Sequence, residues 1–217
     1  MKHLQIVLVT LILGVSWAQG VLGTGLEVQG GDFLETFDNL TSEFASALLV
    51  GQEEAWTGEL KEGGYLLSNS SDDGVVKYIY TTTLAGLASP LSSQTVSVDV
   101  AGTFTNPTYS QAGLLFYFNP ETQFYYAFVV KADTVALVLR DANGFQELAS
   151  TTTDALKVDQ VNRLSVVPES NKVRLLVNGT EVMSFDSPSL EPGGVGILAA
   201  STGVFQFDNF SVEGAKP

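Results

Sequence analysis

The sequence lacks cysteine altogether and has a single histidine, His3, among its 217 residues. His3 lies in an N-terminal segment that we expect to be removed, so the mature protein would have neither an imidazole nor a thiol. This excludes Ser-His-Asp and Cys-His catalysis, disulfides, thiol redox chemistry and zinc or haem sites built on these ligands. Acid–base chemistry would fall to Asp, Glu, Tyr or Lys, and a bound metal would be a hard cation held by oxygens, calcium first.

Basic residues are also scarce, with 10 Lys and Arg against 24 Asp and Glu, and the formal net charge is −14. Binding to a phosphate backbone needs a basic patch, so this balance argues against nucleic acid as a partner. Hydrophobic residues make up 45% of the chain and charged residues 16%. That composition is too apolar for a disordered chain and is sufficient for the core of one large domain.

The N-terminus has the pattern of a secretory signal peptide over residues 1–18. Lys2 precedes a short apolar run, and Ser16 and Ala18 occupy the small-residue positions of a cleavage site. An uncleaved N-terminal anchor is the alternative, although the apolar run is short for crossing a bilayer. We therefore expect a secreted, periplasmic or cell-surface protein that does not span the membrane after cleavage. Export without cysteine is more typical of a bacterial protein. The Gly-rich residues 19–31 are expected to be a linker.

The rest of the chain alternates short apolar segments with turn residues. The clearest strand is expected at residues 95–101, where valines at every second position alternate with polar side chains. Residues 172–177 repeat this pattern, and Asn178-Gly179 predicts a hairpin turn into residues 181–185. Further strands are expected at residues 33–37, 65–68, 75–80, 111–118, 124–130, 134–140, 162–167, 195–200 and 205–212.

These segments predict an all-β fold. About a dozen short strands, spaced about 8–15 residues apart and without a long helical period, are typical of a two-sheet antiparallel sandwich. One exception is residues 39–49, which could hold a short helix capped by Ser42. We find no internal repeat and no second domain boundary, so residues 32–214 are expected to form a single domain.

Several segments occur in an order that is similar to one protein superfamily. They are GDFLETFDNL and EGGYLLS near the start, QAGLLFYFNPETQFYYAFVV in the middle, and VRLLVNGTEV, GGVGILA and FQFDNFSVE near the end. The series covers about residues 32–213 and resembles the concanavalin A-like lectin/glucanase superfamily, especially laminin-G-like domains and bacterial domains related to 3-keto-disaccharide hydrolases. The resemblance implies a jelly-roll sandwich of one concave and one convex sheet, with ligands bound on the concave side or at its rim.

The catalytic motif of this superfamily is missing. Its β-glucan hydrolases carry a Glu-x-Asp-x-Glu strand, in which alternation places the carboxylates on one face. No such strand occurs here. We therefore favour a non-catalytic protein. A glycoside hydrolase whose carboxylates come from different strands of the concave sheet remains the alternative.

Candidate ligand-binding residues follow from the strand alternation. Sugars stack their C–H faces on aromatic rings and bind polar side chains through their hydroxyls. Alternation places Tyr117, Tyr125 and Arg140 on one outer face, opposite the apolar core positions of their strands. Asp99, on the polar face of its strand, and Trp56, in a loop before a strand, are further candidates. The alternatives are aromatic side chains that only cover the sheet, a solvated Asp99 and a buried Trp56.

A metal candidate lies in the last expected strand. In FQFDNFSV the apolar positions shift phase after Asp208, which indicates a β-bulge or two-sided burial at Asp208-Asn209. The resemblance implies a structural Ca²⁺ at this position, held by Asp208 and by backbone carbonyls near Phe33 and Gly63-Gly64. The alternative is an Asp208 that accepts hydrogen bonds from a neighbouring turn.

Together these features predict a secreted, lectin-like sandwich that binds a glycan or another cell-surface component without catalysis. A glycoside hydrolase and a structural component of the cell envelope or an adhesin are the two alternatives. The sequence does not predict the oligomeric state.

Overall fold

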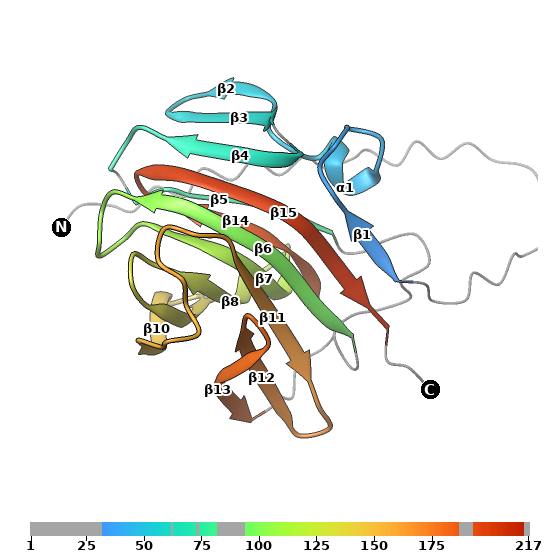
Figure 1. Ribbon diagram of the computed structural model, residues 1–217, viewed down its shortest axis with the longest axis vertical. Coiled ribbons are helices and arrows are strands. Elements are labelled where there is room, and N and C mark those ends of the chain that lie inside the picture. The colour runs from blue at the N-terminus through green and yellow to red at the C-terminus, as the bar shows by residue number, and fades with distance from the viewer. Residues whose placement is uncertain (1–31, 62, 73, 82–93, 187–192, 215–217) are drawn as a thin grey trace, which may run out of the picture.

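The computed structural model describes residues 32–61, 63–72, 74–81, 94–186 and 193–214; the expected signal peptide and linker lie outside them. The described chain is almost entirely β-structure (Figure 1). A short helix, α1 (Glu43–Ser46), begins after Ser42, whose hydroxyl accepts a hydrogen bond from the Ala45 N–H at 2.8 Å. Within the described segments, no helix has the length and apolarity that crossing a bilayer requires.

The described strands form two antiparallel sheets that make a sandwich, as expected from the sequence. One sheet has nine described strands and the other has six. In the nine-stranded sheet the order is β13 (Thr180–Asp186), β12 (Lys172–Val177), β11 (Asn162–Pro168), β6 (Thr95–Phe104), β15 (Gly203–Glu213), β4 (Gly64–Asn69), β3 (Trp56–Lys61) and β2 (Gly51–Glu53), and β1 (Phe33–Glu35) also pairs with β15. In the six-stranded sheet the order is β10 (Gly144–Thr151), β9 (Val135–Asp141), β8 (Phe124–Val130), β7 (Gln111–Asn119), β14 (Gly194–Ala200) and β5 (Val76–Thr81).

The main core lies between the two sheets. β15 and β6 run side by side through the middle of the nine-stranded sheet (Figure 1), and both direct alternate apolar side chains inward. At one end α1 closes the core, because Phe44 stacks on Phe210 with ring centres 4.6 Å apart. Burial of this many aromatic and aliphatic side chains is the main source of stability in a domain without disulfides.

Most expected strands are present with the expected phase. In β6 the three valines at alternate positions are at most 1% exposed. Asn178 and Gly179 both have positive φ angles, 50° and 81°, as a two-residue hairpin turn requires. β2, β3 and β10 were not expected. The six inner residues of β10 are all exposed, so its sequence has no apolar alternation to reveal it.

Two of the β-bulges in the sheets change which candidate side chains face outward. In β15 the register shifts between Asp208 and Ser211 and Asn209 has a φ of 48°, which confirms the bulge expected at Asp208-Asn209. In β7 the register shifts between Phe116 and Asn119, and Tyr117 has a φ of 54°. A bulge adds one residue to a strand and reverses the alternation beyond it. The second bulge was not expected, and it reorganises the candidate site.

Candidate functional site

The outer face of the six-stranded sheet carries a row of aromatic side chains, which we call the aromatic band. Next to it on the same face lies a cluster of smaller apolar side chains, separate from the main core. The band consists of Tyr78 and Tyr80 from β5, Phe118 from β7, Tyr125 from β8, Arg140 from β9 and Phe145 from β10.

Neighbouring rings of the aromatic band are in contact. The ring centres of Tyr80 and Phe118 are 4.1 Å apart, those of Phe118 and Tyr125 are 6.0 Å apart, and those of Tyr125 and Phe145 are 6.2 Å apart. Arg140 pairs with Tyr125 on one side and with Phe145 on the other, and its Cζ lies 5.2 Å from the centre of the Phe145 ring. These separations are typical of aromatic and cation–π contacts. The band therefore crosses the sheet from β5 to β10.

The band is continuous because β14 contributes no side chain between Tyr80 and Phe118. Gly196 of β14 pairs with Tyr80 of β5 and with Leu115 of β7. A Cβ at Gly196 would lie 2.0 Å from the carbonyl oxygen of Ile79, so only glycine fits this close approach. The Tyr80 ring is thus able to pass over β14 and pack on Phe118.

Exposure differs along the band. Phe145 is 36% exposed, whereas Tyr125 is 2% and Phe118 is 1% exposed. Tyr78, Tyr80 and Arg140 are half-buried. A ligand on this face would therefore contact the two ends of the band first, with the buried rings supporting them from below.

The tyrosine hydroxyls of the band remain protonated at neutral pH. Burial, together with repulsion from Tyr80, raises the pKa of Tyr78 to about 12, although the Arg140 charge acts in the opposite direction. Burial likewise raises the pKa of Tyr125 and of Tyr80 above the usual range. The Tyr78 hydroxyl is buried and has no hydrogen-bond partner among the residues that the structure describes. A phenolic hydroxyl can both donate and accept, but a ligand could use this one only if the groups that cover it moved aside.

The structure places two of the expected ligand-binding residues together. Tyr125 and Arg140 are cross-strand neighbours on the outer face, as alternation predicted. The expected position of Tyr117 is wrong. It belongs to the main core, is 7% exposed and packs against Phe116 and Tyr126, because the bulge in β7 turns two successive side chains inward. Phe118 takes the outer position in its place.

Trp56 is not a surface residue. It is the first residue of β3 rather than part of a loop, it is 3% exposed, and its ring packs near that of Phe205 with centres 6.5 Å apart. Its indole N–H is buried without a hydrogen-bond partner within the described residues. This placement agrees with the alternative, a buried Trp, and gives a ligand no access to the ring.

Asp99 lies on a different face from the aromatic band. It is on the outer face of the nine-stranded sheet, where Arg163 Nη1 donates to its Oδ1 at 2.9 Å and Asn209 Nδ2 donates to its Oδ2 at 2.9 Å. Arg163 Nη2 also donates to the Ser211 hydroxyl at 2.8 Å. The carboxylate is therefore engaged in a network that joins β6, β11 and β15, and it does not share a groove with Tyr125 or Arg140.

Asp208 is the cross-strand neighbour of Asp99. Burial raises the pKa of Asp208, and the nearby charges of Asp99 and Asp38 raise it further, while the hydrogen bond from the Asn209 N–H, at 2.7 Å, lowers it. That hydrogen bond is the local contact expected in the absence of a metal. Over the described part of the chain, no group of three or more Asp and Glu side chains is arranged to hold an ion.

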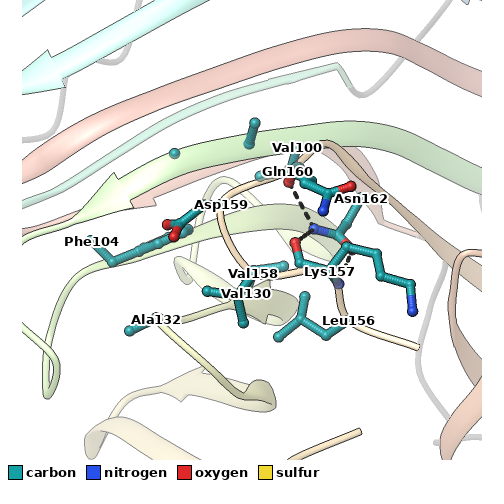
Figure 2. Close-up of a pocket in the computed structure, with 12 residues that line it drawn as sticks. Val100, Phe104, Val130, Ala132, Leu156, Lys157, Val158, Asp159, Gln160 and Asn162 are labelled. Carbon is teal, nitrogen blue, oxygen red and sulfur yellow. Dashed lines mark hydrogen bonds between the residues drawn. The ribbon is translucent and has the colours of Figure 1, made fainter. Parts of the chain in front are cut away.

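A small cavity opens between the end of β6 and the loop that precedes β11 (Figure 2). It holds about 20 Å³, which is room for roughly one water molecule and too little for a sugar ring. Asn162 closes the loop, because its Oδ1 accepts from the Lys157 N–H and its Nδ2 donates to the Lys157 carbonyl, both at 2.8 Å (Figure 2). The cavity is a structural feature of this loop, and the aromatic band remains the candidate site.

The sequence reasoning missed four members of the band. Uninterrupted alternation from Phe116 would place Phe118 in the core, because the bulge leaves no mark in an apolar segment. Phe145 lies in the unexpected strand β10. Tyr78 and Tyr80 could have been found, since Ile79 between them is an apolar core residue and alternation then directs both tyrosines outward.

No protein-family model and no curated protein matches the chain. Several solved structures are similar to the chain. One is the carbohydrate-binding module CBM66 from Bacillus subtilis, with a TM-score of 0.50 and 15% identity over 73% of this chain and 90% of the module. Another is the carbohydrate recognition domain of Emp47p, with a TM-score of 0.53 and 12% identity over 81% of this chain and 94% of that domain.

A third similar structure comes from work on endo-acting O-glycanases that members of the human gut microbiota express to initiate mucin breakdown. Its TM-score is 0.57, with 12% identity over 85% of this chain and 99% of the other. At these identities the similarities define the fold, which is the jelly-roll sandwich of lectins and carbohydrate-binding modules.

Proposed function

We propose that this is an exported member of the concanavalin A-like superfamily that binds carbohydrate on the outer face of its six-stranded sheet, without catalysis. The observation that carries the proposal is the aromatic band, a row of five rings and one guanidinium across six strands. Aromatic rings match the C–H faces of sugars, and the tyrosine hydroxyls and Arg140 match their polar groups.

The structural comparisons support the same proposal. Two of the similar structures are, by their own descriptions, carbohydrate-binding or carbohydrate-recognising domains that cover most of this chain. A shared fold alone does not transfer function, so the proposal rests on the residues of the aromatic band. Export rests on the sequence of residues 1–18.

A glycoside hydrolase is the alternative that one similar structure favours. Its mechanism needs two carboxyl groups about 5–10 Å apart beside the bond to be cleaved. On the outer face of the six-stranded sheet, the described strands place one carboxylate, Glu147, and the Lys131 Nζ binds its Oε2 at 2.5 Å. Asp99 and Asp208 are neighbours on the other sheet, but Arg163 already engages Asp99. We therefore favour binding.

A structural role in the cell envelope or in adhesion is the other alternative. Large side chains fill part of the outer face of the six-stranded sheet, and Phe118 and Tyr125 are nearly inaccessible. A surface that contacts another protein would have the same features. Arg140 and the unpartnered Tyr78 hydroxyl favour a polar ligand instead.

A glycan array probed with the purified protein tests the proposal. We expect binding to a restricted set of glycans, and we expect mass spectrometry to find each bound oligosaccharide at its original length after incubation. Shortened products would establish the hydrolase, and an array without any bound glycan would contradict carbohydrate binding and leave the structural role.

We also propose that a structural Ca²⁺ is bound near Asp208. Asp208 and Asp38 are close enough to repel each other, and the turn at Gly63 approaches Asp38, since a Cβ at Gly63 would lie 3.6 Å from its Oδ1. Two carboxylates fit the oxygen chemistry of calcium, which takes about six to eight oxygen ligands and would need carbonyls and water to complete its shell. Such an ion would stabilise the fold and perform no chemistry.

Melting curves with Ca²⁺ and with a chelator test the metal. Because the folded-state pKa of Asp208 is raised, its protonated form is stabilising, and this contribution is lost as pH rises from about 4 through the raised pKa. At pH 7 without Ca²⁺, Asp208→Asn should therefore melt slightly higher than wild type, whereas only wild type should gain stability from Ca²⁺. The exposed Asp133→Asn is the control and should respond to Ca²⁺ as wild type does. An unchanged wild-type melting temperature would refute the calcium site.

A further inference from the structure

Within the part of the chain that the structure describes, Arg140 forms no ion pair with a carboxylate, although the sequence has 24 acidic residues and only 10 basic ones. Among the described residues, ion pairs engage Lys77, Lys131, Arg163 and Arg174. Arg140 Nη1 donates to the backbone carbonyl of Asp141, and its guanidinium lies over the Phe145 ring. A guanidinium has five N–H donors in a planar fork, so one hydrogen bond to a carbonyl leaves other donors for a ligand.

The cross-strand neighbours of Arg140 are uncharged. The residues next to it across the strands are Tyr125 and Phe145. Glu147 is on the same face, but its hydrogen bond and ion pair with Lys131 keep its pKa low and compensate its charge. The Asp141 carboxylate accepts two hydrogen bonds from Asn143 within the hairpin turn. Both acids of the β9–β10 hairpin therefore have other hydrogen-bond partners, and neither forms an ion pair with Arg140.

Two protonated tyrosines accompany this charge. Tyr125 is directly opposite Arg140, and Tyr78 packs on Tyr125 with ring centres 6.0 Å apart. Burial keeps both phenols protonated far above neutral pH. A guanidinium binds a carboxylate well, because each hydrogen bond to the charged acceptor is stronger than its neutral counterpart, and the neutral phenols beside it add no negative charge.

We propose that the glycan recognised by the aromatic band carries a carboxylate, so that the ligand class is a uronic acid-containing oligosaccharide. This inference rests on the proposed function. The sugar ring lies on the exposed end of the band at Phe145, and its carboxylate binds the fork of Arg140. A planar, two-oxygen acceptor matches the guanidinium in a bidentate pair, whereas a neutral hydroxyl uses one donor only.

The net charge of −14 limits how many acid groups the bound oligosaccharide is expected to carry. It repels a dense polyanion over distance, but at about 0.15 M salt this repulsion is screened beyond roughly 8 Å while the direct contact with Arg140 persists. A short oligosaccharide with few acid groups is therefore favoured over a highly charged polymer.

The test compares trigalacturonic acid with its methyl ester by isothermal titration calorimetry in 0.15 M salt. The ester has the same ring but no charge. We expect the acid to bind roughly tenfold or more tightly than the ester, because the charge-assisted pair is lost in the ester. In Arg140→Gln this preference should disappear, because the acid loses the charge-assisted pair and therefore loses more affinity than the ester does. Lys172→Gln, an exposed cation on the nine-stranded sheet, is the matched control and should retain the preference.

The outcomes separate this inference from the function on which it rests. If the ester and neutral oligosaccharides bind as tightly as the acid, the uronic acid assignment is wrong and carbohydrate binding stands. A sulfated galactan oligosaccharide that binds while trigalacturonic acid shows no advantage over its ester would also overturn the assignment. If no saccharide binds at all, the proposed function fails together with this inference.

Discussion

Replacing Tyr80 or Phe145 by alanine is expected to weaken glycan binding by roughly ten- to a hundredfold. Each side chain lies toward one end of the aromatic band, Tyr80 on β5 and Phe145 on β10. Covering an aromatic side chain of this size with a ligand contributes about 1.5–3 kcal/mol, and 1.4 kcal/mol corresponds to a factor of ten in affinity. Titration calorimetry with a glycan identified on the array measures the change.

Tyr109→Ala is the matched control for these variants. Tyr109 is a 61% exposed aromatic residue in the loop before β7, at the opposite end of that strand from Phe118. Its loss should leave the affinity unchanged. All three variants should melt within a few degrees of wild type, which keeps a binding effect distinct from unfolding. Equal losses in Tyr109→Ala and in Tyr80→Ala would show that the ligand does not select the aromatic band.

Gly196→Ala is expected to lower the free energy of unfolding by at least about 3 kcal/mol, the upper end of ordinary overpacking, because the new Cβ meets backbone rather than a flexible side chain. That Cβ would lie 2.0 Å from the Ile79 carbonyl oxygen and 2.7 Å from the Tyr80 Cα. An alanine also reduces the entropy of the unfolded chain, but this gain is only about 0.4–1 kcal/mol. For a domain of this size the melting temperature should fall by about 6–12 °C.

Gly214→Ala is the control for this substitution. The nearest atom to a Cβ there is Asp32 Oδ1 at 3.9 Å, which is ordinary contact distance, so its stability should be unchanged or slightly higher. Denaturant unfolding followed by circular dichroism measures both variants. If Gly196→Ala unfolds at the same denaturant concentration as Gly214→Ala, the close approach of β5 and β14 is not as described, and the path of Tyr80 over β14 is also in doubt.

The two-sheet sandwich could be predicted because its central strands follow simple physical rules. In β6 polar residues separate the inward valines, and in β12 Val173, Leu175 and Val177 face inward at alternate positions, since one face of each strand meets the core. The turn at Asn178-Gly179 was equally clear, because both residues tolerate positive φ. β10 could not be predicted in this way, since its inner residues are exposed on both faces and no alternation arises.

The candidate site could be predicted only in part. Tyr125 and Arg140 were placed together correctly, because β8 and β9 alternate without interruption. Tyr117 was misplaced because Phe116, Tyr117 and Phe118 are all apolar aromatics, so the sequence does not show where the bulge reverses the phase. Asp99 faces outward from its strand as expected, but it lies on the other sheet from Tyr125 and Arg140, since alternation predicts which side of a strand a residue faces and not the sheet to which the strand belongs.

The most direct test of carbohydrate binding by the aromatic band is the affinity of one array-selected glycan for wild type and for the double variant Tyr80→Ala/Phe145→Ala. The two side chains lie toward opposite ends of the band and do not stack on each other, so their effects should add. We expect a loss of more than about a hundredfold with an unchanged circular dichroism spectrum. An affinity equal to that of wild type would place the binding site elsewhere and contradict the account.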